Sequence, residues 1–390
     1  MPAPKEPARP ARVPQPGTRE PVKPPAHRRP SVGWLALLML LGAAPAPAQP
    51  PALEAVAAGL EIDPGSITLS GISSGAFMAQ QFHVAHSASV RGVALIAGGP
   101  YRCAAGSYPP FSWMDVTGLY AATSVCSNTN PLWFYQGPPD AGFSIRETRR
   151  EAEAGTIDDV GGLAGDRVWL LSGSEDDTVP RGVVEALERY YRAFLDGGPL
   201  HHERLAGAGH AMVTDDFGNA CDVSESPFIS DCDYDAAKHL LTHLYGPLRP
   251  PAAGVEPAAG FDQSAFFDAG DESLSMSPVA YLYVPAACRA GGRCRLHVAL
   301  HGCQQYQARI GDAFHARAGY NEWAESNRIV VLYPQTTGWS PLFTFGKARN
   351  PKGCWDWWGY TGGDHHTRRA PQIKALAAMI NVLLGTPLLR

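Results

Sequence analysis

Several features that would point to other classes of protein are scarce or absent in this 390-residue sequence. It has no Cys-x-x-Cys pair, the spacing that many structural zinc sites use, so we expect neither a bound metal nor another cofactor. Only 18% of its residues are charged, and Asp and Glu outnumber Lys and Arg by 37 to 32. A net negative charge argues against nucleic acid as a partner.

A hydrophobic run of membrane-spanning length is also missing from the first fifty residues. The apolar stretch within 31–49 runs for about a dozen residues and follows Arg28 and Arg29. It ends in small residues, and Ala46-Pro47-Ala48 resembles a signal-peptide cleavage site. We interpret residues 1–48 as a signal peptide with a long, basic, proline-rich leader, and expect no stable membrane insertion after its cleavage. A membrane anchor and a later translation start are the alternatives.

All eight cysteines follow residue 48, and an even count in an exported chain is typical of disulfide bonds. We therefore expect a secreted, extracellular and monomeric protein, with a periplasmic location as the alternative. Short separations in the sequence favour the pairs Cys221–Cys232 and Cys288–Cys294. The remaining pairs, Cys103–Cys126 and Cys303–Cys354, are one choice among several, because eight cysteines allow 105 pairings.

Apolar, β-branched runs alternate with helical patterns after residue 48. The expected strands are 66–71, 90–99, 166–173, 279–285, 295–302 and 327–335, and the expected helices are 75–86, 181–195, 234–246 and 371–385. This alternation predicts an α/β fold, with a mostly parallel sheet that has helices on both faces. Residues 246–260 contain four prolines and no apolar periodicity, which predicts an internal linker.

The segment GISSG at 71–75 has the Gly-x-Ser-x-Gly pattern of a nucleophile elbow, between an expected strand and an expected helix. In this frame Ser73, rather than Ser70 or Ser74, is the expected nucleophile. The pattern is short, and chance matches occur in a chain with 41 glycines. The interpretation therefore depends on finding an acid, a histidine and oxyanion donors elsewhere.

An acid and a base follow the serine in the chain order of α/β-hydrolases, Ser then Asp then His. Asp176 lies in the loop after the expected strand 166–173, with Asp177 as the alternative acid. These carboxylates could instead only cap the helix that begins near Pro180. His210 lies in the glycine-rich segment GAGHAM and is the candidate base.

The expected oxyanion strand occurs far downstream of the serine. In most α/β-hydrolases a strand and a backbone-donor loop precede the nucleophile, whereas here the matching segment LHVALHGCQQ ends in His301, Gly302 and Cys303. This order predicts a circular permutation in which residues 49–390 form one catalytic domain. We expect the backbone N–H groups of Cys303 and Ser74 to hold the oxyanion.

These segments, together with SGSEDDTVP and NPKGCWDWWGY, resemble the extracellular polyhydroxybutyrate depolymerases whose lipase box is near the N-terminus. The resemblance covers nearly all of residues 49–390 in the family's order. It implies a secreted serine esterase that cleaves poly(3-hydroxybutyrate), or a related short-chain polyester, through an acyl-enzyme. Ser73, Asp176 and His210 would be the triad. Many members add a polymer-binding module, which the sequence does not show after its catalytic motifs, so amorphous polymer or soluble oligomers are the expected substrates.

Four of the nine tryptophans lie within 339–358. Aromatic faces suit an uncharged polyester, and we expect Trp355 above all, with Trp357 and Trp339, to line the substrate cleft. Burial in the core is the alternative for each. Two other functions stay open: a feruloyl or acetyl-xylan esterase, and a non-catalytic secreted binding protein on a hydrolase scaffold.

Overall fold

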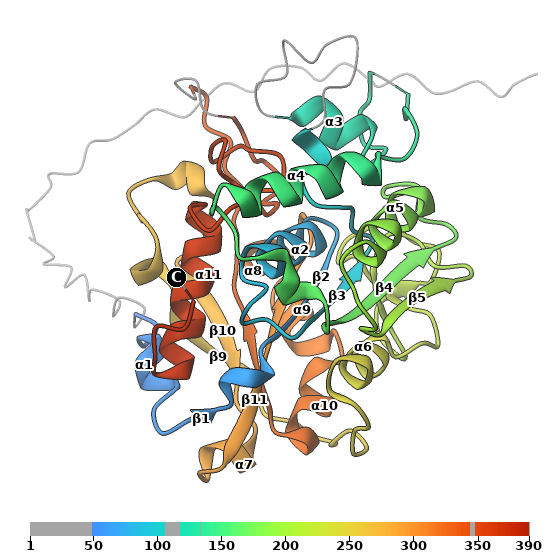
Figure 1. The fold of residues 1–390 in the computed structure, drawn as a ribbon. Coiled ribbons are helices and arrows are strands. Elements are labelled where there is room, and N and C mark those ends of the chain that lie inside the picture. The colour runs from blue at the N-terminus through green and yellow to red at the C-terminus, as the bar shows by residue number, and fades with distance from the viewer. Residues whose placement is uncertain (1–48, 106–117, 133, 344–347, 390) are drawn as a thin grey trace, which may run out of the picture. The chain divides into compact units, whose positions relative to one another are not determined.

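The computed structural model describes residues 49–105, 118–132, 134–343 and 348–389, which fall within one compact unit (Figure 1). The predicted signal peptide lies outside the described residues and stays a prediction. A nine-stranded sheet forms the centre. Its strands are β1 (Glu61–Ile62), β2 (Thr68–Ile72), β3 (Gly92–Ile96), β4 (Arg167–Gly173), β5 (Leu200–Leu205), β9 (Ala259–Asp262), β10 (Val279–Tyr283), β11 (Arg293–Leu300) and β12 (Ile329–Tyr333).

The sheet joins the two halves of the chain. Its order is β5-β4-β3-β2-β11-β12-β10-β9, with β1 paired to β11, and only the contacts of β10 with β9 and β12 are antiparallel. The predicted α/β fold with a mostly parallel sheet is therefore confirmed. Strands from before and after the proline-rich segment pair directly, β2 with β11, as the permuted order requires. Each half thus completes the other half's sheet.

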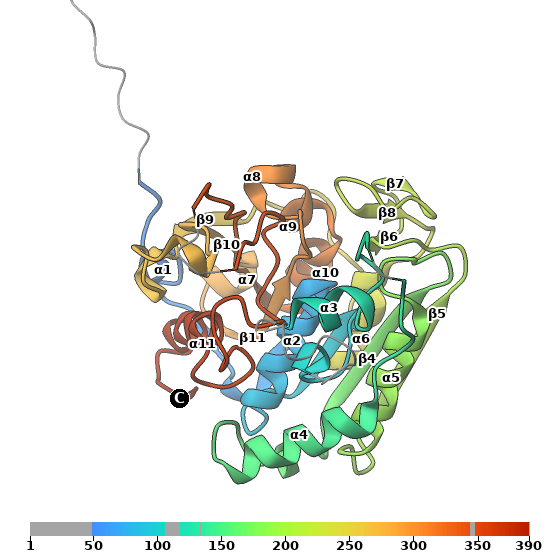
Figure 2. The same ribbon diagram turned by 90° about the horizontal axis from the view of Figure 1, so that it is seen from above.

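Helices cover both faces of this sheet (Figure 2). The helices of the described residues are α1 (Leu53–Val56), α2 (Ser74–Ala85), α3 (Leu119–Ser124), α4 (Ala141–Glu153), α5 (Arg181–Arg192), α6 (Ala236–Tyr245), α7 (Ala286–Arg289), α8 (Gln307–Ile310), α9 (Ala313–Arg317), α10 (Tyr320–Asn327) and α11 (Pro371–Leu384). Pro371 occupies the first turn of α11 and Gly385 its left-handed C-cap, the punctuation expected of a helix. Among the described residues, no helix has both the length and the apolarity needed to cross a membrane.

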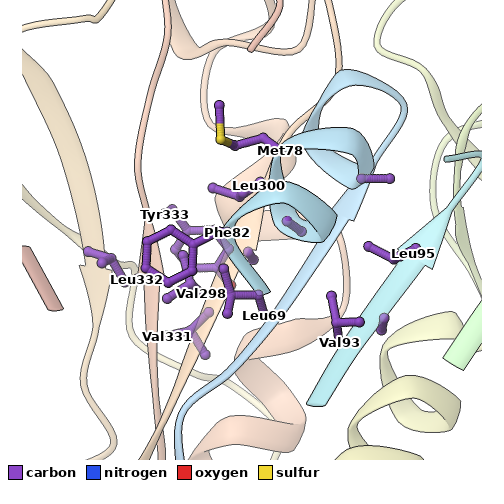
Figure 3. Packing of buried hydrophobic residues seen from close by; sticks show 14 of the residues in the cluster. Leu69, Met78, Phe82, Val93, Leu95, Val298, Leu300, Val331, Leu332 and Tyr333 are labelled. Atoms are coloured by element: carbon purple, nitrogen blue, oxygen red, sulfur yellow. The ribbon is translucent and has the colours of Figure 1, made fainter. Parts of the chain in front are cut away.

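Successive side chains of β2 point to opposite faces of the sheet. Leu69 belongs to the apolar cluster that also contains Met78 and Phe82 of α2 (Figure 3). Thr68 and Ser70 point the other way, where their hydroxyls bond the Tyr245 hydroxyl of α6 and the Tyr320 hydroxyl of α10, at 2.6 and 2.8 Å. Successive strand residues face opposite sides of a sheet, so α2 packs on one face and α6 and α10 on the other.

A buried histidine links the two halves within the core. The ring of His297 on β11 is hydrogen-bonded to Thr68 at 2.8 Å and to Ser70 at 2.7 Å, both on β2. Burial lowers the pKa of His297 to about 3, so the ring stays neutral and its two nitrogens serve as one donor and one acceptor. A buried polar network that is fully paired favours a single arrangement of the elements that it joins. This one spans the junction between β2 and β11.

The sequence analysis missed several elements at the surface. α4 was not expected because only its residues Ala141, Ser144 and Thr148 are buried, so its apolar stripe is weak. A small second sheet, β6 (Met212–Thr214), β8 (Ile229–Asp231) and β7 (Asn219–Ala220), was also missed because its strands are only two or three residues long. The expected linker 246–260 is irregular until β9 begins at Ala259.

The eight cysteines form four disulfide bonds. Their pairs are Cys103–Cys126, Cys221–Cys232, Cys288–Cys294 and Cys303–Cys354. Short separation favoured Cys221–Cys232 and Cys288–Cys294, and the other two pairs were one choice among several; the structure contains all four. Cys221–Cys232 and Cys303–Cys354 hold loops at the carboxyl end of the sheet, where the candidate site lies.

We predict that acid weakens the fold through its buried neutral histidines. His315 stacks on Tyr281 with 3.8 Å between ring centroids, and burial lowers its pKa from 6.5 to about 4. Between these values the unfolded chain binds a proton at this residue and the folded chain does not, so stability is lost as pH falls from 6.5 toward 4. His315→Phe keeps the stacked ring and removes the titration. The free energies of unfolding measured by urea denaturation at pH 7.5 and 4.5 should therefore differ less in the variant, by about 1–3 kcal/mol; an equal difference in both proteins would contradict the prediction.

Candidate active site

Ser73 occupies the sharp turn between β2 and α2. Its backbone has φ 54° and ψ −125°, a conformation that costs energy for a non-glycine residue, and its N–H donates to the Ile96 carbonyl at 2.9 Å. A Cβ on Gly71 would lie 2.3 Å from the carbonyl carbon of Gly75, and a Cβ on Gly75 would lie 2.3 Å from the carbonyl oxygen of Leu300. Both glycines are therefore required sterically, and the Gly-x-Ser-x-Gly pattern here is an elbow.

Asp176 and His210 form a hydrogen-bonded pair. The Asp176 carboxylate meets Nδ1 of His210 at 2.8 Å and is almost fully buried, and its other oxygen accepts the N–H groups of Thr178 and Val179. Asp177, the alternative acid, is exposed. The N-cap of α5 is Pro180 without a side-chain cap, so Asp176 does not serve as the cap of that helix. The geometry favours Asp176 as the partner of His210.

The loop that carries His210 is fixed from both sides. The N–H of His210 donates to the Ser224 hydroxyl at 2.7 Å, and the N–H of Gly209 donates to the Cys221 carbonyl at 2.8 Å. The disulfide Cys221–Cys232 ties this loop to the end of β8. The histidine ring is therefore held by its carboxylate partner and by its own backbone.

The loop after β11 places the Cys303 amide. His301 is buried, which lowers its pKa to about 4; its Nε2 accepts the Thr336 N–H at 3.2 Å, so Nδ1 carries the proton and donates to the Gly302 carbonyl at 2.7 Å. In a trans peptide the C=O and the following N–H point in opposite directions. The Cys303 N–H therefore points away from the His301 ring.

Further bonds hold the same loop. The Gly302 N–H donates to Oε1 of the buried Gln305 side chain at 2.7 Å, and the Gln304 N–H donates to the Lys352 carbonyl at 2.7 Å. The Cys303–Cys354 disulfide adds a covalent tie. Within the part of the chain that the structure describes, the amides of Ser74 and Cys303 donate to no protein acceptor. Both stay available for an oxyanion, which remains a prediction.

Ser73, His210 and Cys303 line one cavity of about 520 Å³ at the carboxyl end of the sheet. Its walls are mainly apolar and aromatic, and Phe77 stacks on Trp357 with 4.0 Å between ring centroids. The other lining residues that bear on the argument are Ile72, Leu119, Ala122, Val179, Phe228, Arg349, Lys352 and Trp358. The arrangement suits an uncharged, partly methylated ligand.

The structure corrects two of the tryptophan predictions. Trp355 is fully buried, and its indole N–H donates to the His301 carbonyl at 3.0 Å, so it supports the oxyanion loop from behind and does not line the cavity. Trp339, whose backbone pairs with Asn350, also lies outside the cavity lining. Trp357 does line the cavity, as does Trp358.

The segment that carries the two lining tryptophans is fixed by a buried carboxylate, Asp356, that the sequence analysis missed. One oxygen of Asp356 accepts the N–H groups of Trp358, Gly359 and Tyr360, and the other accepts from the N–H and hydroxyl of Thr361. The dense run of aromatic and glycine residues in this segment is the only sequence signal for such a turn. Phe77 and the α3 segment were also missed, since nothing near them marks a binding residue.

The described residues contain no group of three or more His, Cys, Asp or Glu side chains that could hold a metal ion. The candidate site brings together a strained serine, a carboxylate-bound histidine and two amides that have no protein acceptor among the described residues, around one cavity. On an α/β fold with a mostly parallel sheet, these groups are those of a serine hydrolase of the α/β class.

Comparison with known proteins narrows this class. No family model matches the chain. It is 38% identical over 328 residues to a poly(3-hydroxybutyrate) depolymerase of Delftia acidovorans, covering 83% of this chain but only 60% of that protein. It is 32% identical to a polyhydroxybutyrate depolymerase of Talaromyces funiculosus over 364 residues, covering 90% of this chain and 97% of that protein.

Two solved structures agree with the fold. The crystal structure of the PHB depolymerase from Penicillium funiculosum matches with a TM-score of 0.73 and 31% identity, over 87% of this chain and 99% of that one. A serine-to-alanine variant of PHB depolymerase in complex with an R3HB trimer matches with the same TM-score and 32% identity. The chain belongs to the polyhydroxybutyrate depolymerase family.

We predict that two disulfide bonds of this protein have different consequences when removed. Replacing Cys303 and Cys354 together by serine should lower kcat at least about tenfold, because the loop that presents the Cys303 amide loses its covalent tie. Replacing Cys288 and Cys294 by serine should lower stability and leave kcat within about twofold, because this pair joins α7 to the start of β11 at the opposite end of the strand. Steady-state hydrolysis of p-nitrophenyl butyrate and urea denaturation measure both effects; equal kcat losses in the two variants would contradict this role.

Proposed function

We propose that this protein is a secreted serine esterase that hydrolyses poly(3-hydroxybutyrate), or a related short-chain polyhydroxyalkanoate, to oligomers and monomer. The observation that carries the proposal is the meeting of three predicted groups at one cavity. Ser73 stands on a strained elbow, His210 is bound by Asp176, and the amide of Cys303 is presented by a loop that four separate contacts hold. The names of the two curated relatives agree with this substrate.

The reaction begins when the Ser73 hydroxyl attacks the ester carbonyl and His210 takes its proton. Asp176 orients the imidazole and stabilises its protonated form. The amides of Cys303 and Ser74 hold the negative charge that develops on the carbonyl oxygen. The leaving alcohol takes the proton from His210, and water then hydrolyses the acyl-enzyme through the same histidine, which frees a carboxylic acid and restores Ser73.

The cavity and its rim favour a polyester over an acetylated or feruloylated sugar. Sugars need many hydrogen-bonding side chains, whereas Phe77, Trp357 and Trp358 offer aromatic faces. Large apolar side chains are exposed on two segments that continue from the cavity wall. They are Leu132 and Phe134, which follow the lining residue Thr129, and Leu342 and Phe343, whose segment is bonded to the lining residue Arg349. Exposed apolar patches of this kind usually bind a surface.

Export to the extracellular space is part of the proposal. Four disulfide bonds are stable only in an oxidising compartment. The net negative charge of the sequence disfavours nucleic acid as a partner. Sequencing of the N-terminus of protein recovered from the medium tests the predicted cleavage after Ala48.

We predict that the purified protein clears a suspension of amorphous poly(3-hydroxybutyrate) granules and that Ser73→Ala does not. The free energy of unfolding of the variant, measured in urea, should stay within about 1 kcal/mol of the parent value, because the substitution removes one hydroxyl at the cavity surface. Turbidity loss and release of 3-hydroxybutyrate measure the activity. Clearing by the variant would reject the elbow assignment, and activity on feruloyl or acetyl esters without any clearing would move the substrate to the carbohydrate esters.

A second pair of variants tests the acid. Asp176→Asn should lower kcat by about 10³–10⁴-fold, because the amide favours the wrong imidazole tautomer and cannot stabilise the protonated ring. Asp177→Asn is the matched control, and since Asp177 is exposed it should stay within about threefold of the parent. A large loss in the control with a small loss in Asp176→Asn would exchange the two roles.

A further inference from the structure

The cavity has an electrostatic asymmetry that hydrolysis of a neutral polyester does not require. Its lining includes two cationic side chains, Arg349 and Lys352, and no Asp or Glu. The chain as a whole is acidic, with a formal net charge of −5. The lining surface therefore carries charge opposite in sign to the protein's overall charge, and the nearby carboxylate of Asp176 is buried behind His210.

Neither cation has a carboxylate partner among the residues that the structure describes: none lies within ion-pair distance of Arg349 or Lys352. One Nη2 hydrogen bond of Arg349, to the Leu342 carbonyl at 2.9 Å, uses part of its guanidinium. In the described part of the chain, the other guanidinium donors and the Lys352 ammonium group donate to no protein acceptor, so both residues can bind an anion.

The backbone between these two residues is fixed against the loop of Gly302, Cys303 and Gln304. The Lys352 carbonyl accepts the Gln304 N–H at 2.7 Å, one residue beyond Cys303. The Asn350 side chain bonds the N–H and the carbonyl of Cys354, at 3.0 and 2.8 Å, and Cys354 is joined to Cys303. The cations are therefore carried by a braced segment at one side of the reacting centre.

We infer that Arg349 and Lys352 form a subsite for the terminal carboxylate of linear 3-hydroxybutyrate oligomers. This inference rests on the proposed function and names the form of substrate that the same cavity prefers. Each hydrolysis breaks one ester C–O bond, adds the hydroxyl of water to the acyl carbon and leaves a carboxylate on that fragment. The interior of the polymer is uncharged, so only chain ends and released oligomers carry the anion that this subsite binds.

The subsite acts on binding and not on the chemical step. The carboxylate of an oligomer is separated from the reacting ester by at least one monomer unit, so its attraction to the cations is similar in the ground state and the transition state and lowers KM with little change in kcat. Both cations are exposed, and the interaction is therefore screened by salt.

The test compares the 3-hydroxybutyrate trimer as the free acid with its methyl ester, which has the same backbone and no charge. At low ionic strength the parent should show a KM for the free acid at least about threefold below that for the ester, and 0.5 M NaCl should remove the difference. Arg349→Gln with Lys352→Gln should abolish the preference by raising the KM for the free acid to the value for the methyl ester. Arg309→Gln with Lys374→Gln removes the same charge outside the cavity lining and should keep the preference.

Equal KM values for the two trimers in the parent would overturn the inference, as would a preference that survives in the double cavity variant. If neither trimer is hydrolysed, the proposed function fails separately. Calorimetric binding of the two trimers to Ser73→Ala then decides the subsite: tighter binding of the free acid, lost on removal of the two cations, supports it, and equal or absent binding rejects it.

Discussion

The parallel pairing of β2 with β11 is the contact on which the candidate site depends. His297, Val298, Ala299 and Leu300 lie beside Thr68, Leu69, Ser70 and Gly71 across this pairing, although more than two hundred residues separate the two strands in sequence. Because parallel strands end at the same edge of a sheet, Ser73 and the loop of Gly302 and Cys303 emerge side by side. The core network of His297 with Thr68 and Ser70 joins the two strands in this register, and a slip of one residue would move Ser73 away from the Cys303 amide, the proposed oxyanion donor across the pairing. Gly75 adds a steric condition, since it allows the start of α2 to approach the end of β11.

Neutral histidines have two different tasks in this molecule. His297 and His301 are buried without a carboxylate partner, and burial keeps their pKa values at about 3 and 4; they act as fixed donors and acceptors that join strands and orient a peptide. His210 lies at the cavity and is bound to a buried carboxylate, the arrangement that lets an imidazole accept a proton and hold it. The surroundings of each ring, rather than the residue type, decide which task it has.

Local signals led to the candidate triad more readily than to the binding surface. Flanking glycines, strand ends and chain order pointed to Ser73, Asp176 and His210, whose catalytic roles stay a prediction, and the displaced His301-Gly302-Cys303 segment indicated that the two halves share one sheet. The choice of Trp355 was wrong because residue type does not tell which side of an irregular loop a side chain takes; its indole turns inward to the His301 carbonyl while Trp357 faces the cavity. The hydrogen bond from the Gln304 N–H to the Lys352 carbonyl joins two segments that are far apart in the sequence, and no local pattern records such a contact. α4 has too narrow a buried face to produce a clear periodicity.

On the proposed assignment, the elbow makes Ser73, and neither of the neighbouring serines Ser70 and Ser74, the reactive nucleophile. Labelling with a fluorophosphonate, followed by mass spectrometry of the peptide that contains residues 66–85, tests this claim directly. We predict one phosphonate per protein, located on Ser73, and no labelling after heat denaturation. A label on Ser70 or Ser74, or labelling that persists in the denatured protein, would contradict the account.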